Sequence, residues 1–282
     1  MGPTASGKTA LSVQLALRLG GELINADSRQ AIAELRVGVC KPTAEELCGI
    51  PCHGLDWRAL GQPYSAALFA GRAREAITGI WARGRLPIVV GGTGLYVRAL
   101  LTGFDFGRLP PSPAPSEGTV ESLRRLAPDV AARVDLSNPR RVERALALAR
   151  AGRRPTVNPP GWSAVRLAIE VERPELRRRI ESRAQRLVSQ ELADEVSTLR
   201  RQGWPDQVIA DSAIGYREAL AWVDGRLAAS LAAAAIASRT WRYARAQLTW
   251  LRSEPDLTWV AGAAAAEAAI LHGSKLTLVA RP

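Results

Sequence analysis

Residues 2–9 run Gly2-Pro-Thr-Ala-Ser-Gly7-Lys8-Thr9 and satisfy the pattern G-x-x-x-x-G-K-[ST]. In this pattern, backbone N–H groups of a glycine-rich turn cradle phosphate groups at the N-terminus of a helix. Lys8 is then expected to reach the terminal phosphates, and the Thr9 hydroxyl is expected to ligate Mg²⁺. Apolar residues recur at helical spacing from Lys8 to Leu19. The stretch therefore predicts a phosphate-binding loop that opens a helix.

The motif should follow a buried strand, yet it begins here at the second residue. In folds of this kind the preceding strand sits centrally in the sheet, so its loss would expose apolar neighbours. We expect the natural chain to start upstream, with Met1 at the end of that strand.

Helical and strand patterns alternate after the loop. Residues Glu22–Asn25 predict a short strand, residues 64–83 an amphipathic helix, and Leu86–Val90 a buried strand that leads into a Gly91-Gly92 turn and a further helix. Such alternation is typical of a parallel sheet covered by helices. The sequence thus predicts an α/β fold of the P-loop NTPase-like kind, with a parallel sheet and flanking helices.

The composition changes to Pro, Gly and Ser between residues 102 and 119, which predicts a stiff connection. We expect residues 1–102 to form the first part of the core and residues 103–138 to form a shortened helical insertion. Residues 139–282 are expected to complete the core, with a returning strand at 165–171 and a mostly helical C-terminal part.

Charge and composition narrow the class of protein. The chain has 38 Lys and Arg against 27 Asp and Glu, a formal net charge of +11, which favours a polyanionic partner such as nucleic acid. It is 47% hydrophobic and 23% charged, as in ordinary soluble domains. No apolar run reaches the roughly 20 residues of a membrane span, and no signal peptide is evident. We expect a cytoplasmic protein that acts as a monomer and has no membrane partner.

Three cysteines, Cys40, Cys48 and Cys52, lie near His53. Structural zinc sites usually pair ligands two to four residues apart in two separated clusters, and this spacing differs. We therefore expect reduced thiols and no zinc site.

Two polar residues follow expected strands. Asp27 comes directly after Glu22–Asn25 and Ala26, at the edge where ligands bind in parallel sheets, so it is a candidate general base. An Asp at this position also fits an N-cap or a turn. Thr93 likewise ends a strand and opens a helix, and its position alone favours a helix cap.

Several motifs occur in order along the chain. They are Gly2–Thr9, Asn25-Ala-Asp-Ser-Arg-Gln30, Lys41-Pro42, Tyr64-Ser-Ala66, Gly91-Gly-Thr-Gly-Leu-Tyr96, Arg141 with Arg144-Ala-Leu146, Ile214-Gly-Tyr-Arg-Glu218 and Gln247-Leu-Thr-Trp250. This ordered set closely resembles the tRNA dimethylallyltransferase family. The resemblance implies transfer of a dimethylallyl group from dimethylallyl diphosphate to the exocyclic amine of the adenosine 3′ of a tRNA anticodon, without ATP hydrolysis.

The resemblance also implies roles for individual residues. Asp27 would remove the proton of the amine as the C–N bond forms, and Thr93 would orient the amine. Mg²⁺ on Thr9 would stabilise the departing diphosphate. The expected diphosphate-binding residues are Gly2, Thr4, Ala5, Ser6, Gly7, Lys8, Thr9 and Arg217.

Basic segments are expected to contact tRNA. Residues 140–154 carry six arginines and one acid, and residues 239–252 carry four arginines, no acid and interleaved aromatic residues, which suits a phosphate backbone. A solvated helix face is the other interpretation of each segment. The expected tRNA-contacting residues are Ser28, Arg29, Gln30, Lys41, Arg141, Arg144, Arg239, Arg242, Arg245 and Gln247.

The chain departs from the family pattern at six positions, namely Ile32, Val39, Leu68, Ser212, Trp241 and Ala246. These residues are expected to remove polar contacts from the substrate channel and from the RNA side.

Three other functions remain compatible with the sequence. A small-molecule kinase would share the loop and Asp27 but would consume ATP. An adenylate isopentenyltransferase would act on free nucleotides and would not need the basic C-terminal half. An inactive tRNA-binding relic would bind tRNA in a salt-sensitive way without forming product.

Overall fold

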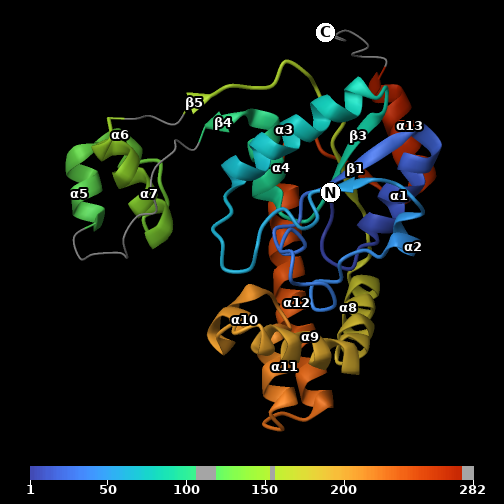
Figure 1. The fold of residues 1–282 in the computed structure, drawn as a ribbon. Coiled ribbons are helices and arrows are strands. Elements are labelled where there is room, and N and C mark those ends of the chain that lie inside the picture. The colour runs from blue at the N-terminus through green and yellow to red at the C-terminus, as the bar shows by residue number, and fades with distance from the viewer. Residues whose placement is uncertain (106–118, 153–155, 275–282) are drawn as a thin grey trace. The chain divides into compact units, whose positions relative to one another are not determined.

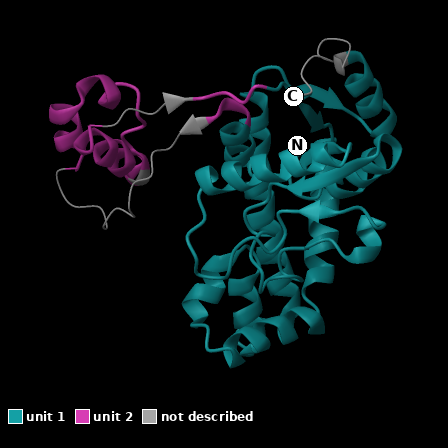
Figure 2. Ribbon diagram, turned by 45° about the horizontal axis from the view of Figure 1, so that its top comes forward, with its two compact units in different colours: residues 1–100, 162–282 teal, residues 101–161 magenta. Residues whose placement is uncertain are grey.

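The computed structural model describes residues 1–105, 119–152 and 156–274. The chain divides into two units: residues 1–100 with 162–282 form unit 1, and residues 101–161 form unit 2 (Figure 2). The proline-rich stretch at 106–118 and the basic residues Arg153 and Arg154 lie outside the described residues.

A parallel sheet lies in unit 1. Its middle strand is β1 (Gly21–Asn25), flanked by β2 (Cys52–His53) and β3 (Leu86–Val90). All five residues of β1 are buried, as expected for a parallel strand that is covered on both faces. The predicted α/β architecture with a parallel sheet is thus confirmed.

A second parallel pair joins β6 (Leu167–Ile169) to β7 (Thr258–Val260). The backbone of Met1 pairs with β6, because its amino group donates to the Leu167 carbonyl at 2.6 Å and its carbonyl accepts from the Ile169 N–H at 3.0 Å. Residues 2–9 therefore continue directly from the edge of β6.

One charged residue of the sheet, Glu22 on β1, is buried. Its carboxylate accepts two hydrogen bonds from Arg83, at 2.9 and 2.7 Å, and lies 2.8 Å from His53 Nε2. The Arg83 hydrogen bonds, aided by His53, lower the pKa of Glu22 to about 2 against the opposing effect of burial. The buried charge is thus paired and links the middle strand to β2 and to the end of a covering helix.

Helices cover the sheet of unit 1 (Figure 1). They are α1 (Lys8–Leu19), α2 (Ala44–Leu47), α3 (Ala66–Ala82), α4 (Gly94–Thr102) and α13 (Ala263–Ser274). Val13 and Ala16 of α1 pack on Leu23 of β1, and Arg18 of α1 forms a 2.7 Å ion pair with Glu267 of α13. The α1 apolar stripe therefore fixes the helix that follows the glycine-rich loop.

The C-terminal part is helical, as predicted. It contains α8 (Arg173–Leu187), α9 (Gln190–Arg201), α10 (Asp206–Ser212), α11 (Tyr216–Val223) and the long α12 (Ala229–Arg252) (Figure 1). A core cluster joins α9, α10 and α11 to the segment around Ile32 and Leu35. Ile32 is fully buried there, so this departure from the family pattern does not face the substrate cavity described below.

Unit 2 contains β4 (Phe104–Asp105), α5 (Thr119–Leu126), α6 (Pro128–Ala131), α7 (Pro139–Arg150) and β5 (Thr156–Val157). Leu123, Val142 and Leu146 form its own hydrophobic cluster. This corrects the predicted insertion boundary at residue 138, because α7 packs on α5 and α6 and unit 2 extends to Gly161.

No helix among the described residues is long and apolar enough to cross a membrane.

Candidate active site

A cavity of about 760 Å³ in unit 1 is lined by the glycine-rich loop, the residues after β1 and β3, and the faces of α8, α10 and α12. It lies at the carboxyl ends of β1 and β3, where open parallel sheets bind ligands. The predicted site residues that line it are Thr4, Ala5, Gly7, Lys8, Thr9, Asp27, Ser28, Arg29, Gln30, Lys41, Thr93 and Arg239.

The loop at residues 2–9 folds into a tight turn. Ala5 and Gly7 have φ values of 63° and 87°, and the Ser6 N–H donates to the Pro3 carbonyl at 3.3 Å. Gly7 is the N-cap of α1 and makes no side-chain capping hydrogen bond. The first N–H groups of α1 thus lack a capping side chain, which leaves them suited to an anion. Gly2 and Ser6 belong to this turn but do not line the cavity.

Lys8 is the principal cation of this loop. Its ammonium group donates to the Pro3 carbonyl at 2.8 Å. Burial lowers the pKa of Lys8 to about 8; the Asp27 carboxylate opposes this shift and the Arg183 guanidinium adds to it. Lys8 and Arg183 thus place two positive charges near the loop, which Asp27 offsets in part, and this arrangement suits an anionic ligand.

Asp27 lines the cavity and also caps a turn. Its Oδ1 accepts hydrogen bonds from the N–H groups of Arg29 at 2.9 Å and Gln30 at 3.4 Å. The turn expected at Asp27 is therefore present, and it holds the carboxylate at the cavity wall; the role of general base stays a prediction.

Thr93 joins the ends of two strands. Its N–H donates to the Ala26 carbonyl at 3.2 Å, and its Oγ1 accepts from the Ser28 N–H at 3.1 Å. Thr93 thus lies beside the turn that Asp27 caps. Tyr243 of α12 also lines the cavity; desolvation and the Asp27 charge raise its pKa to about 12, while hydrogen bonding to Thr93 acts in the opposite direction.

Gln247 does not reach solvent, which corrects its predicted contact with tRNA. It is buried; its Oε1 accepts from the Thr4 N–H at 2.8 Å and its Nε2 donates to the Gly92 carbonyl at 2.9 Å. The side chain ties α12 to the two glycine turns.

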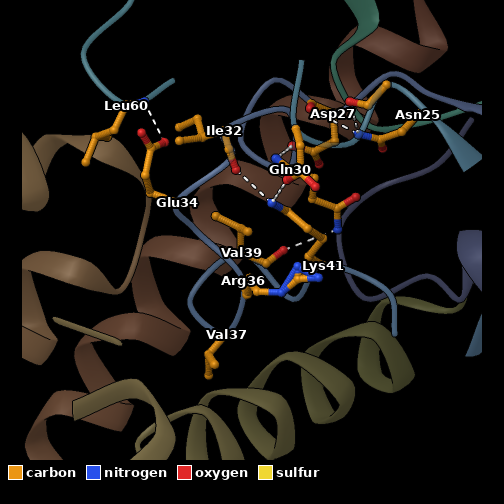
Figure 3. Close-up of polar contacts among 12 residues, drawn as sticks. Asn25, Asp27, Gln30, Ile32, Glu34, Arg36, Val37, Val39, Lys41 and Leu60 are labelled. Carbon is orange, nitrogen blue, oxygen red and sulfur yellow. Dashed lines mark hydrogen bonds and ion pairs between the residues drawn. The ribbon is translucent and has the colours of Figure 1, made fainter. Parts of the chain in front are cut away.

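The structure also corrects the predicted contact of Lys41 with tRNA (Figure 3). Its side chain is 2% exposed, and Nζ donates to the Ile32 carbonyl at 2.7 Å and to the Asp56 carboxylate at 2.5 Å. Gln30 lies on the cavity wall, but its amide nitrogen donates to the carbonyls of Val39 and Cys40, at 3.2 and 2.8 Å. Both side chains hold the segment that surrounds them.

Arg217 does not line the cavity, contrary to the predicted diphosphate contact. Its guanidinium pairs with Asp211 Oδ1 at 2.6 Å and is half exposed. Arg183, which the sequence did not single out, lines the cavity from α8, and its positive charge lowers the pKa of Lys8. Arg179 is one turn earlier on α8 and donates to the Ser6 carbonyl at 3.5 Å, so the i, i+4 spacing of two arginines was the available signal.

The remaining predicted basic residues lie in different places. Arg239 lines the cavity and pairs with buried Glu218 at 2.7 Å. Arg242 and Arg245 are exposed on α12. Arg141 and Arg144 are on α7 of unit 2, where Arg141 is exposed and lies 3.6 Å from Asp135.

The cysteines are free thiols, and Cys40 and Cys52 line the cavity. Within the described ranges, no three His, Cys, Asp or Glu side chains gather as a metal site.

Comparison with known proteins places this geometry in a family. A model of the IPP transferase family matches residues 30–254. The chain belongs to the IPP transferase family. The family match begins just after Asp27, so the glycine-rich loop lies before it.

Individual relatives extend the likeness over most of the chain. A tRNA dimethylallyltransferase of Thermomicrobium roseum is 43% identical over 266 residues, which cover 88% of this chain and 80% of the relative. The solved structure of a full-length tRNA isopentenylpyrophosphate transferase from Bacillus halodurans is 34% identical, with a TM-score of 0.72 and coverage of 98% and 94%. That of the Staphylococcus epidermidis tRNA isopentenylpyrophosphate transferase is 28% identical, with a TM-score of 0.71 and coverage of 98% of both chains. Membership of the IPP transferase family thus rests on sequence and fold together.

Proposed function

We propose that the protein transfers a dimethylallyl group from dimethylallyl diphosphate to the exocyclic amine of the adenosine 3′ of a tRNA anticodon and releases diphosphate. The observation that carries this proposal is that Asp27 and Thr93 line the same cavity as Lys8 and Thr9. One cavity therefore combines a base for an amine with a cradle for an anionic leaving group. All of these residues come from one chain, so a monomer is sufficient.

The glycine-rich loop and α8 stabilise the leaving group. As the allylic C–O bond breaks, negative charge develops on the diphosphate. The Lys8 ammonium, the uncapped N–H groups of α1 and the Arg183 guanidinium are arranged around the same space. Fixed positive groups of this kind stabilise developing charge without reorganising during the reaction. Arg183 replaces Arg217 in this proposal, because Arg183 lines the cavity, whereas Arg217 does not and its guanidinium is paired with Asp211.

Asp27 and Thr93 deprotonate and orient the acceptor amine. An aromatic exocyclic amine is a weak nucleophile, so its proton must leave as the new C–N bond forms. Asp27 supplies a carboxylate whose Oδ1 is held by two backbone N–H groups. Thr93 and the neighbouring Tyr243 supply hydroxyl groups that orient the amine. The adenine must leave its stack to enter this cavity.

The donor atoms at the cavity fit Mg²⁺. This ion prefers oxygen ligands and is commonly held by one or two protein groups together with substrate phosphates and waters. The Thr9 hydroxyl and the Asp27 carboxylate both line the cavity, so Thr9 would hold the ion against the diphosphate. The ion would add Lewis-acid stabilisation of the leaving group.

Exposed arginines support tRNA as the substrate. Arg242 and Arg245 continue along α12 from Arg239, which lines the cavity. Arg141 of unit 2 is exposed as well. Together with the net charge of +11, these residues suit contacts to a phosphate backbone. We also assign Ser28 and Arg29 to the acceptor side, since they flank Asp27 on the cavity wall.

The decisive experiment is mass spectrometry of nucleosides from unmodified tRNA incubated with the protein, Mg²⁺ and dimethylallyl diphosphate. We expect prenylated adenosine with the wild type and a rate at least about 100-fold lower with Asp27→Asn, since the general base is removed. The control is Asp256→Asn, an exposed residue at φ 55°, a backbone conformation that Asn tolerates well. Parallel incubations with AMP and with ATP separate the adenylate transferase and the kinase. Absence of prenylated tRNA, or an unchanged rate in Asp27→Asn, would contradict the proposal.

A further inference from the structure

Glu195 of α9 holds a segment that lies far from it in the sequence. Its Oε2 accepts hydrogen bonds from the N–H groups of Arg36 at 2.8 Å and Val37 at 2.7 Å. Its Oε1 accepts from the Gly38 N–H at 3.1 Å and from the Tyr216 hydroxyl. One carboxylate thus binds three consecutive backbone N–H groups, and such charge-assisted bonds are stronger than neutral ones.

Tyr216 completes this clamp. It is fully buried, and its ring and hydroxyl lie so close to Gly38 that a Cβ there would be 2.4 Å from the ring. Because φ is not positive at Gly38, the requirement for glycine is one of space. The contact therefore fixes the distance between α11 and the backbone at Gly38.

The clamped segment is connected to Asp27 by hydrogen bonds (Figure 3). Directly after Gly38, the carbonyls of Val39 and Cys40 accept from the Gln30 side chain. The Gln30 N–H in turn donates to Asp27 Oδ1 at 3.4 Å. A continuous path of backbone and hydrogen bonds thus runs from Glu195 to the carboxylate on the cavity wall.

Arg29 provides a second connection between the same parts. Its N–H donates to Asp27 Oδ1 at 2.9 Å, and its guanidinium donates to the Ser212 carbonyl at 2.7 Å. Ser212 ends α10, which belongs to the same core cluster as α9 and Tyr216. The turn around Asp27 is therefore held from the C-terminal helices at two points.

We propose that Glu195 is a positioning residue for Asp27: it fixes backbone 36–38, and through Gln30 it orients the carboxylate that accepts the amine proton. This inference rests on the proposed function, since it assigns Asp27 the base role. It adds a residue outside the cavity whose loss misplaces the base while leaving the diphosphate cradle intact.

The test compares Glu195→Gln with Glu191→Gln, the same change one turn earlier on α9 at an exposed residue. A glutamine retains its size but replaces one acceptor oxygen with an NH₂ group, which faces N–H donors and cannot accept from them. In Glu195→Gln we expect faster amide hydrogen exchange in residues 28–41 and a single-turnover transfer rate lower by about 100-fold. We expect the Kd for dimethylallyl diphosphate to stay at the Glu191→Gln value, while the melting temperature falls by a few degrees because hydrogen bonds to the carboxylate are lost. Tyr216→Phe, which removes one of the four donors, should show the same split with a smaller loss.

Three results would overturn the inference. One is unchanged exchange and unchanged transfer in Glu195→Gln. Another is a parallel loss of donor affinity and transfer, which would make Glu195 a residue of general stability. If the wild type forms no product, the proposed function fails and the positioning role fails with it. Slowed transfer with protected residues 28–41 would also contradict the path through the backbone.

Discussion

Two walls of the cavity, the loop at residues 2–9 and the segment at residues 27–41, are held in place by different kinds of interaction. The loop at residues 2–9 is shaped mainly by local interactions, since its turn closes between Pro3 and Ser6 and Lys8 bonds to Pro3. Gln247 of α12 and Arg179 of α8 each add one hydrogen bond to it. The segment at residues 27–41 is held by side chains from elsewhere, namely Glu195 and Tyr216. A cavity wall that is shaped by contacts within its own segment, a local wall, can be recognised from that segment's sequence. A wall that is held by side chains distant in the sequence cannot.

Removal of the loop cation should give the largest effect. We expect Lys8→Met to lower kcat/KM for dimethylallyl diphosphate by about 1000-fold, as for loss of a principal group that stabilises a leaving anion. Steady-state kinetics with saturating tRNA measures this change. The control is Arg201→Met on α9, an exposed residue whose guanidinium donates a hydrogen bond to Thr198 of the same helix. Activity of Lys8→Met within tenfold of the wild type would show that the local wall does not bind the diphosphate.

Gly38→Ala should break the other wall by overpacking. The added Cβ meets the Tyr216 ring at 2.4 Å, so we expect the free energy of unfolding to fall by about 2 kcal/mol. Urea denaturation measures this value. Gly71→Ala in α3 is the matched control, since nothing lies within 4 Å of its Cβ and alanine favours a helix by about 0.5–1 kcal/mol. Equal stability of the two variants would show that the Tyr216 contact is loose.

The affinity for dimethylallyl diphosphate should depend on pH, and this effect should be the smallest of the three. The pKa of Lys8 is lowered to about 8 in the free protein, and the diphosphate binds the protonated amine. Affinity should therefore be constant below pH 8 and fall by up to about tenfold per pH unit above it, until the higher pKa of the complex is reached. Calorimetric titration from pH 7 to 9.5 measures this slope. Lys8→Arg should remove it, because arginine stays charged; a slope that persists would assign the titration to another group.

The sequence predicts the fold and the local wall well for a physical reason. Periodicity and glycine spacing act over a few residues, so α1, β1, β3 and the loop follow from their own segments. The predictions for Lys41 and Gln247 failed because a polar motif residue gives the same pattern whether it faces a ligand or a distant backbone. Lys41 binds the Ile32 carbonyl, and Gln247 binds two glycine turns. Only the packing of remote segments distinguishes these cases.

The insertion boundary illustrates the same limit. The helix α7 has an apolar face, but its own sequence gives no indication of the partner against which that face packs. Val142 and Leu146 pack on Leu123, so the helix belongs to unit 2. Arg183 was not predicted because α8 contains several arginines, and the i, i+4 spacing of Arg179 and Arg183 does not by itself distinguish a ligand-facing pair from a solvated one.

The strand pair β4 and β5 has a consequence for the length of unit 2. The chain enters and leaves through β4 and β5, an antiparallel ladder in which Phe104 pairs with Val157 and Asp105 with Thr156. Antiparallel pairing keeps the two crossing strands adjacent however many residues lie between them, and closing a longer loop adds only about 0.6 kcal/mol for each doubling of its length. Residues can therefore be added to or removed from unit 2 at little cost in free energy, while the cavity of unit 1 stays unaltered.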